Sequence, residues 1–388
     1  MSQRSNVLYG IILILPIIDI ATAFTEKWPI SVGAIIRPLI MMILILYLMM
    51  QRQKRPIIFL LAYSIIMISF IVQFLTKTPF SLLAEISFYL KIAYFTTMLW
   101  LTTHLMTTKK LSQDRLLLMS NLALIIIGIT YWLAFFTNTY TKSYSYIKTG
   151  NAGWYFSANE LSVIILILFA LTLIRFIRKL DTTTILGILL ASSVFPMIGT
   201  KTALYGGFIV LIPIIIYAIF KKLHPQYFLL LVLCGALFIY IPTTSGATNK
   251  QIEQAPAEVE EEKHTLLSSR DVYLRDTFAD FQAAPTKQKL FGLGYGGNYT
   301  KEPKTIEMDF FDLFFSIGIV GTVVMLLAGL ALVYQLLTWN VTFIYLYSLG
   351  VLGLIMGISF VAGHVLFAPA VITYVAIFTI WTGSIRDG

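Results

Sequence analysis

The sequence predicts an all-α polytopic membrane protein. Of its 388 residues, 58% are hydrophobic and only 12% are charged, whereas soluble domains carry about 25% charged residues. The hydrophobic residues also gather in long stretches, and a helix of roughly 20 apolar residues crosses a hydrocarbon core about 30 Å thick. The chain therefore has too little charge to cover a surface in water, and its apolar stretches have the length that a bilayer requires.

Twelve apolar stretches, separated by polar or helix-breaking residues, are expected to form transmembrane helices. They lie approximately at 7–24, 32–50, 56–75, 82–106, 116–136, 159–177, 183–199, 202–220, 227–243, 311–336, 341–361 and 365–383. The chain then divides into helices one to nine over 1–243, one long loop over 244–310, and the last three helices over 311–388.

Lysine and arginine in the short loops predict that both termini are cytoplasmic, because cytoplasmic loops carry the excess of these residues. The inner set would comprise Arg4, Arg52, Lys54, Arg55, Lys109, Lys110, Arg115, Arg175, Arg178, Lys179, Lys221, Lys222 and Arg386. The short outer loops would hold only Lys27, Lys77, Lys142, Lys148 and Lys201. The net charge of +9 then reports mainly topology, and no recognition motif indicates a nucleic acid as partner.

The residue types that bind metals or act as nucleophiles give little signal. The chain has a single cysteine, Cys234, within the ninth stretch, and its four histidines lack the close spacing of a zinc site. No phosphate-binding loop or serine nucleophile elbow is present in the sequence. We therefore expect no metal and no cofactor, and we keep only His364, on the short turn before the last stretch, as a site candidate.

The long loop is expected to lie outside the cell and to contain short amphipathic helices. Its acidic run, 254–262, is typical of a solvated linker. The run from Ser268 to Asp271 has the Ser-x-x-Asp form of a capping box, and apolar residues follow it at helical spacing. This predicts a helix on the membrane surface. Arg270 and Arg275 on that helix either point toward an anionic group in an outer cavity or bind lipid headgroups.

A glycine-rich segment follows, with Gly292, Gly294 and Gly297 in the spacing G-x-G-x-x-G. A dinucleotide-binding turn needs a strand before it and a helix after it in a βαβ unit, which an extracellular loop between membrane helices does not supply. The alternative interpretation is a flexible turn that lets the backbone approach a substrate.

Three carboxylates, Glu307, Asp309 and Asp312, mark the end of the long loop and the start of the tenth stretch. Asp309 and Asp312 are three residues apart and share a helical face, while Glu307 points elsewhere. Carboxylates at the mouth of a membrane helix either stay hydrated or serve a site, and at least one of them suits a helix N-terminus.

Two cations, Arg37 and Lys91, lie inside apolar stretches, where a charge costs about 2.5–3.5 kcal/mol. Such residues usually face a cavity, and Pro38 would open the helix toward the same cavity. Asp19 and Glu85 are the candidate counter-ions, so that simple internal ion pairing is the alternative.

Four segments in this order make the sequence similar to the bacterial O-antigen ligase and O-antigen polymerase superfamily. They are Tyr155–Leu161, with Asn159 at the start of a central helix; Gly199–Leu204, with Lys201 where arginine is usual; the loop helix with Arg270 and Arg275 and the segment Phe291–Gly296; and Glu307–Gly321. In the last segment Glu307 and Met308 stand where the ligases have histidine and asparagine. Acidic versions of this segment resemble polymerase-type members of Gram-positive exopolysaccharide, capsule or teichuronic-acid pathways.

The resemblance implies a metal-independent glycosyltransferase of the bacterial plasma membrane. Its donor would be an undecaprenyl-pyrophosphate-linked oligosaccharide and its acceptor a glycan, and association with other polysaccharide-assembly proteins would be compatible with this role. The departing pyrophosphate develops negative charge, which fixed cations can stabilise, and the attacking hydroxyl needs a base. Arg270, Arg275 and Lys201 are expected to bind pyrophosphate, with Arg37 or Lys91 as further contacts.

Glu307 is expected to orient or deprotonate the acceptor hydroxyl, with Asp309 as its substitute. Two alternatives stay open from the sequence. An O-antigen-ligase-like enzyme would transfer a glycan to a different acceptor, and a flippase or exporter would move an anionic glycolipid along intramembrane charges. The best-matching residues lie in one outer loop and not near the midplane, which favours the enzyme.

Overall fold

The computed structural model describes residues 3–51, 57–78, 80–108, 111–143, 150–221, 225–244, 270–296, 305–337, 342–363 and 365–385. Regular structure in these ranges is helical, apart from an isolated β-bridge between Lys142 and Asn151. The helices are α1 (Gln3–Phe24), α2 (Val32–Met49), α3 (Ile57–Thr76), α4 (Leu82–Thr108), α5 (Gln113–Phe136), α6 (Ala158–Arg178), α7 (Thr182–Ile198), α8 (Lys201–Phe220), α9 (Pro225–Thr244), α10 (Arg270–Ala283), α11 (Thr286–Phe291), α12 (Asp309–Leu336), α13 (Phe343–Ala362) and α14 (Pro369–Ser384).

Each predicted apolar stretch coincides with one of these helices, and α10 and α11 lie between α9 and α12 in the chain. Eight helices in the described ranges are long and apolar enough to cross a membrane, and shorter apolar helices accompany them. The fold class, an all-α multi-pass membrane protein, is therefore confirmed. The number of twelve crossings and the cytoplasmic placement of both termini stay predictions.

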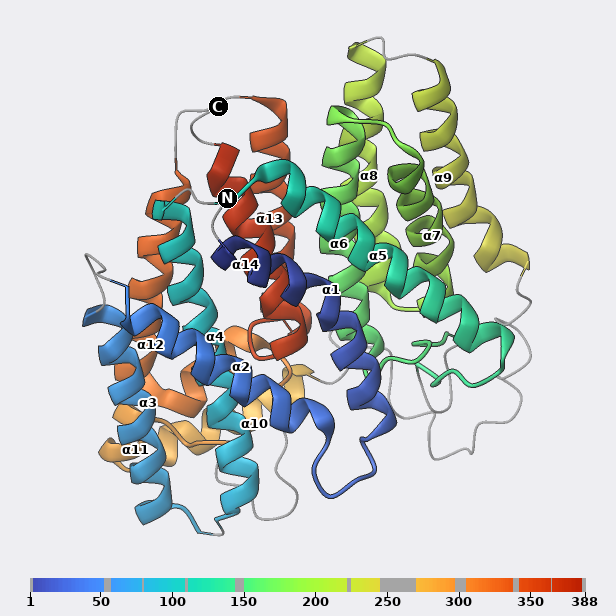
Figure 1. Cartoon of the computed structure of the whole chain (residues 1–388). Helices are drawn as coiled ribbons and strands as arrows, with labels where there is room; N and C mark the ends of the chain where they lie inside the picture. The colour runs from blue at the N-terminus through green and yellow to red at the C-terminus, as the bar shows by residue number, and fades with distance from the viewer. Residues whose placement is uncertain are drawn as a thin grey trace, which may run out of the picture.

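Helix α6 forms the centre of the bundle. The hydroxyl of Ser157 accepts a hydrogen bond from the backbone amide of Glu160 at 3.3 Å and so caps its first turn. Every residue from Leu161 to Phe176 is buried, as expected for a helix that is apolar all round. Figure 1 shows α6 among α5, α7, α8 and α14, and it packs against all four.

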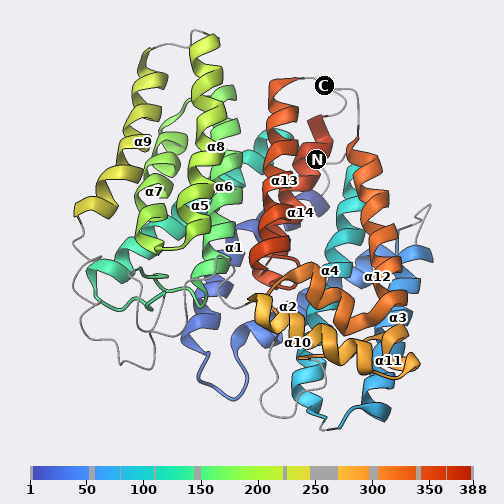
Figure 2. The same cartoon turned by 180° about the vertical axis from the view of Figure 1, so that it is seen from behind.

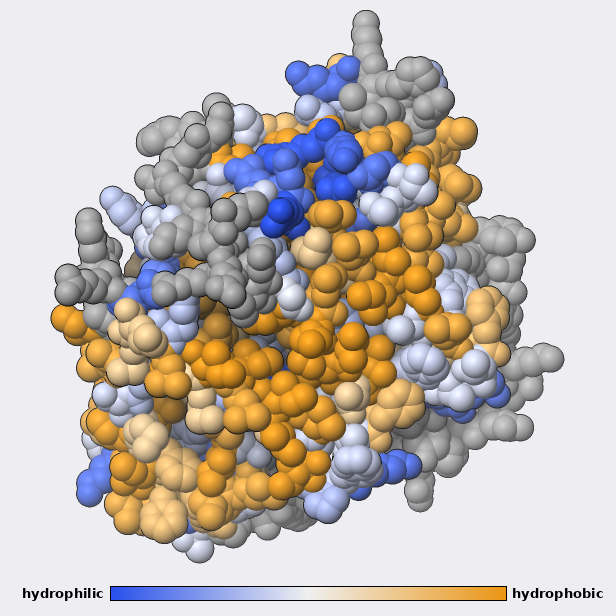
Figure 3. Space-filling view, in the orientation of Figure 1, coloured by the Kyte–Doolittle hydropathy of each residue, from blue (hydrophilic) through white to orange (hydrophobic). Residues whose placement is uncertain are grey.

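The outer surface of the bundle is apolar along several helices. On α2, Ile43 and Leu46 expose 65% and 62% of their surface, and Leu75 on α3 exposes 73%. Figure 3 shows hydrophobic residues across a broad band of this face, with hydrophilic residues gathered toward its margins. Exposed apolar patches of this extent are unsuited to water and indicate the surface that faces lipid.

One end of the bundle, which we call the loop end, carries α10 and α11. Both helices lie beside the first part of α12, as Figure 2 shows from behind. A small hydrophobic cluster joins them, separate from the main core, and it consists of Phe281, Ala284, Leu293, Ile306, Met308 and Phe315. The polar helices of the loop end are thus packed onto the membrane helices by buried apolar contacts.

The sequence suggested one continuous helix for the tenth predicted stretch, but the structure divides it. Gly318 divides α12, with φ 68° and ψ −171°, a conformation that is essentially restricted to glycine. A Cβ atom at this position would lie 2.4 Å from the backbone nitrogen of Gly292 and 2.5 Å from the carbonyl oxygen of Leu290. The break therefore lets the glycine-rich segment pass directly over the helix.

Replacing Gly318 with alanine is expected to destabilise the loop end by about 1–3 kcal/mol, because it adds backbone strain and a steric clash. Limited proteolysis of the full chain in detergent would detect faster cleavage between α9 and α12. Gly329→Ala in the same helix is the matched control, since a Cβ there meets no atom within 4 Å. Equal cleavage rates for the two variants would contradict the expectation.

Candidate functional site

An ion pair between Arg270 and Glu307 lies at the loop end, where α10 begins and just before α12 begins. The Nη2 atom of Arg270 donates to Oε2 of Glu307 at 3.0 Å, and the two side chains are 13% and 37% exposed. The buried Nε atom of Arg270 has no hydrogen-bond partner among the described residues. A guanidinium has more donors than this one bond uses, but the Nε donor is buried out of reach of a ligand.

The backbone around Glu307 is fixed by close packing. Glu307 has a φ of 64°, which is uncommon for a residue other than glycine. Gly363, after α13, approaches it so closely that a Cβ atom there would lie 2.5 Å from the carbonyl oxygen of Glu307. Unfavourable backbone conformations persist only where the surrounding structure determines them, so the fold sets the position of this carboxylate.

The two aspartates beside Glu307 are buried and serve the backbone. The hydroxyl of Ser359 donates to Oδ2 of Asp309 at 2.7 Å. The backbone amides of Val365 and Leu366 donate to the same oxygen at 2.9 Å each. Asp312 accepts from two backbone amides of the preceding turn at 2.8 and 3.1 Å. These bonds orient the start of α12 and the turn before α14, and they leave Glu307 as the more open carboxylate.

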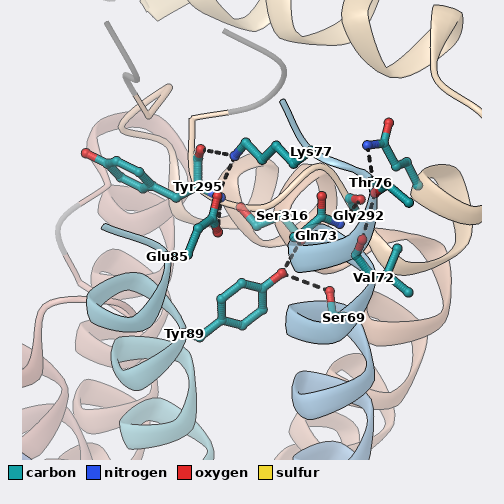
Figure 4. Close-up of polar contacts among 11 residues, drawn as sticks. Ser69, Val72, Gln73, Thr76, Lys77, Glu85, Tyr89, Gly292, Tyr295 and Ser316 are labelled. Atoms are coloured by element: carbon teal, nitrogen blue, oxygen red, sulfur yellow. Dashed lines mark hydrogen bonds and ion pairs between the residues drawn. The ribbon is translucent and has the colours of Figure 1, made fainter. Parts of the chain in front are cut away.

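A second ion pair, Lys77 with Glu85, anchors the glycine-rich segment to α3 and α4 (Figure 4). The Nζ atom of Lys77 lies 2.5 Å from Oε1 of Glu85 and donates to the carbonyl oxygen of Tyr295 at 2.6 Å. The backbone amide of Tyr295 donates to Oε2 of Glu85 at 2.9 Å. Both charged side chains are almost fully buried, at 1% and 0% exposure. Burial lowers the pKa of Lys77, and the bond with Glu85 opposes this shift.

Two polar side chains of α3, one and two turns before Lys77, hold the same segment. The hydroxyl of Ser69 donates to the carbonyl oxygen of Phe291. The side-chain amide of Gln73 donates to the carbonyl oxygen of Gly292 at 2.5 Å. The carbonyl groups at the end of α11 have no partner within that helix, and they are therefore bonded to a membrane helix.

The other side of the glycine-rich segment bonds to the break in α12. The backbone amide of Leu293 donates to the carbonyl oxygen of Phe315 at 2.7 Å, and that of Gly294 to Ser316 at 3.2 Å. A Cβ atom on Gly294 would lie 2.8 Å from Oε2 of Glu85. The sequence interpretation placed a substrate against this backbone. The structure corrects this interpretation at Gly292 and Gly294, because the groups that lie close to their backbone belong to α12 and α4.

Replacing Lys77 with alanine is expected to destabilise the protein by about 3–5 kcal/mol, because Glu85 would be left as a buried unpaired charge. Thermal unfolding of the purified full chain in detergent would measure the loss as a lower midpoint. The double variant Lys77→Met with Glu85→Leu removes both charges and should recover much of the stability. A single variant that unfolds like the wild type would show that the pair contributes no stability.

A known protein family matches nearly the whole chain. The family model described as O-antigen ligase like membrane protein matches residues 2–263 and 240–381. The chain belongs to this family. Comparison with curated proteins and with solved structures gives no match. Membership of the O-antigen ligase like family suggests a glycosyltransferase-type enzyme that transfers or polymerises glycans at the membrane.

Two ion pairs were predicted inside the membrane for this O-antigen ligase like protein, and one of them is present. Arg37 donates to Oδ1 of Asp19 at 2.6 Å, and both side chains are largely buried between α1 and α2. Glu85 was the second candidate counter-ion, and that assignment is wrong, because Glu85 binds Lys77. Lys91 lies on an exposed position of α4.

Of the remaining predicted site residues, Arg275 shares α10 with Arg270, whereas Lys201 and Asn159 lie on other helices. Lys201 is exposed in the first turn of α8, where the hydroxyl of Thr200 caps the helix. Asn159 is half-buried in the first turn of α6. Arg275 is 78% exposed, with Nε 3.7 Å from its neighbour Asp276. His364 lies outside the described residues.

Sequence reasoning missed the residues that hold the glycine-rich segment, chiefly Gln73 and Lys77. A signal for one of them was present, because Lys77 and Glu85 have opposite charges and stand at the facing ends of two consecutive apolar stretches. Their contact with Tyr295, more than two hundred residues away, depends on the tertiary fold and has no local signature.

Proposed function

We propose that this protein joins undecaprenyl-pyrophosphate-linked oligosaccharide repeat units into a cell-surface polysaccharide on the outer face of the bacterial plasma membrane. The observation that carries the proposal is the pair of Arg270 and Glu307 at the loop end, within a chain of the O-antigen ligase like family. With both termini in the cytoplasm, the count of crossings puts the long loop outside, and with it α10 and α11 at the loop end.

The two members of the pair match the two needs of glycosyl transfer. Glu307 accepts the proton of the acceptor hydroxyl, whose oxygen forms the new bond to the anomeric carbon of the donor sugar. The bond between that carbon and the pyrophosphate oxygen breaks, and the lipid pyrophosphate leaves with the electron pair. Arg270 stabilises the negative charge that develops on it, without a metal. Direct displacement inverts the anomeric centre.

The ion pair itself suggests how the donor prepares the base. Arg270 binds Glu307 at 3.0 Å, and among the described residues its buried Nε atom has no hydrogen-bond partner. A pyrophosphate group competes for this guanidinium and frees Glu307 for the acceptor. Arg275, exposed on α10, adds positive charge at the loop end. Lys201 on α8, Lys91 on an exposed position of α4 and Arg37, which pairs with Asp19, stay further candidates for contacts with the donor. Asp309 is less suited to act as the base, because its Oδ2 atom already accepts three hydrogen bonds.

The proposal can be tested with purified full-length protein in liposomes that contain lipid-linked repeat units. Polymerase activity gives a ladder of lengthening chains on a gel. Transfer of one preformed block to a different acceptor would support a ligase and contradict chain polymerisation. Movement of the glycolipid between leaflets without any new glycosidic bond would overturn the enzyme and support a flippase.

A further inference from the structure

Polar side chains of α3 and α4 hold the backbone of the glycine-rich segment (Figure 4). The Nζ atom of Lys77 donates to the carbonyl oxygen of Tyr295, and Oε2 of Glu85 accepts from the backbone amide of the same residue. The side-chain amide of Gln73 donates to the carbonyl oxygen of Gly292. We call Gln73, Lys77 and Glu85 the α3–α4 anchor. The segment can neither slide along α3 nor turn over without breaking these bonds.

The α3–α4 anchor is a costly way to stabilise a fold. Lys77 and Glu85 are 1% and 0% exposed, and removing two charges from water costs free energy that their attraction often only offsets. Gln73 is also fully buried, and its Oε1 atom has no hydrogen-bond partner among the described residues. An apolar pair would serve stability as well, whereas a buried polar group can select one arrangement of the backbone.

The segment transmits this fixed position to the helix that follows Glu307. The backbone amides of Leu293 and Gly294 donate to the two carbonyl oxygens that lie just before the break in α12, at 2.7 and 3.2 Å. The part of α12 before Gly318 is therefore a short helix that is bonded at its end to the anchored segment. Its first residue, Asp309, follows Glu307 by two positions, about 9 Å along the helix from the bonded carbonyls.

The same segment also contacts the support of Arg270. Leu293 is fully buried in the small hydrophobic cluster of the loop end, together with Phe281 of α10 and Met308, which follows Glu307. Helix α10 begins with Arg270 and is connected to the segment through α11. One anchored segment thus packs against the elements that carry both members of the Arg270 pair.

We propose that Lys77 and Glu85 are positioning residues for glycan transfer, which set the place of Glu307 relative to Arg270 through the glycine-rich segment. The inference rests on the proposed function for the reaction that is measured. Both side chains are too deeply buried to meet the substrate, and they act through the backbone of Tyr295. A displacement of about 1 Å that arises far from the reacting atoms can reduce a rate by about 10²-fold.

The test compares stability with reaction rate in the double variant Lys77→Met with Glu85→Leu, purified as the full chain. Its thermal midpoint in detergent should stay close to that of the wild type, because no unpaired charge remains. In liposomes with lipid-linked repeat units, its rate of glycosidic bond formation at saturating donor should fall ~10²-fold. The KM for the donor should change little, since Arg270 is retained. Lys77→Arg keeps a donor for Glu85 and Tyr295 and should recover part of the rate.

Arg175→Met with Asp181→Asn is the matched control, because it removes another ion pair with a buried arginine, at 2.5 Å between α6 and α7. Asparagine keeps an acceptor for the first turn of α7, which Asp181 caps. The control should form glycosidic bonds at the wild-type rate.

A second variant keeps the inference testable if the double variant does not fold. Gln73→Met removes one bond to the segment and leaves the ion pair in place. It should lower the rate at saturating donor by a smaller factor, ~10-fold, again with little change in the KM for the donor.

Three results would overturn the inference. A wild-type rate in the folded double variant, or in Gln73→Met if the double variant does not fold, would mean that the α3–α4 anchor serves only the fold. A rate loss shared by the control would be a general effect of removing a buried ion pair. A raised KM with an unchanged maximal rate would mean that Lys77 contacts the donor directly. Failure of the proposed function is distinguishable, because the wild type itself would then form no glycosidic bond, and the inference would fall with it.

Discussion

Replacing Glu307 with glutamine is expected to reduce glycan elongation by about 10²–10⁴-fold, because the acceptor hydroxyl would lose its base. Glutamine has nearly the same shape, and the backbone at this position is fixed by Gly363, so the fold should persist. Gel analysis of chain length with the purified full-length variant, at matched protein levels, measures the loss. Donor binding should be retained, since the amide no longer competes for Arg270.

Glu26→Gln is the matched control for this experiment, because Glu26 is an exposed acid in the connection between α1 and α2. It should leave chain length unchanged. The shorter carboxylate of Glu307→Asp should restore part of the activity that glutamine abolishes. Long chains made at the wild-type rate by Glu307→Gln would remove this residue from the chemistry, and a loss shared by Glu26→Gln would point to a general effect of charge.

Replacing Arg270 with alanine is expected to have the second large effect, a loss of about 10²–10³-fold in elongation rate. Removing one preorganised donor from a site of developing negative charge has an effect of this size. The variant should also bind lipid pyrophosphate more weakly, which separates it from Glu307→Gln. Binding and elongation are therefore measured on the same preparations.

Lys27→Ala is the control for the loss of a cation, because Lys27 is exposed in the same α1–α2 connection as Glu26. It should change neither the binding of lipid pyrophosphate nor the elongation rate. Arg270→Lys retains the charge and loses the planar fork of donors, so it should recover binding more than rate. If Arg270→Ala binds and elongates like the wild type, the pyrophosphate is held elsewhere, and the contact with Glu307 is structural only.

Much of the fold could be predicted because the bilayer imposes simple rules. An apolar stretch of sufficient length must form a helix to satisfy its own backbone, so the positions of the apolar helices follow from hydropathy. The start of α10 near Arg270 followed from helical spacing, and its packing partners did not. The break in α12 was missed, because a glycine within an apolar helix gives no sign of which backbone will approach it.

The candidate site was predictable only in part, for a similar reason. Resemblance pointed to Arg270 and Glu307 separately, thirty-seven residues apart, and the structure pairs them. The sequence offered Asp309 as a substitute for Glu307, but burial and three hydrogen-bond donors distinguish Asp309. Lys77 and Glu85 belong to the support of the site through Tyr295, which lies in a different part of the chain.

The sequence by itself determined that this is a multi-pass helical membrane protein, because the length and hydropathy of each apolar stretch are local properties that suffice for a helix to cross a bilayer. It also indicated the family through the order of short motifs. Only the tertiary structure decided which charges meet and that Gly318 breaks α12 so that the glycine-rich segment can cross it. Those features are contacts between distant segments, and their partners are chosen by packing and burial of the whole bundle.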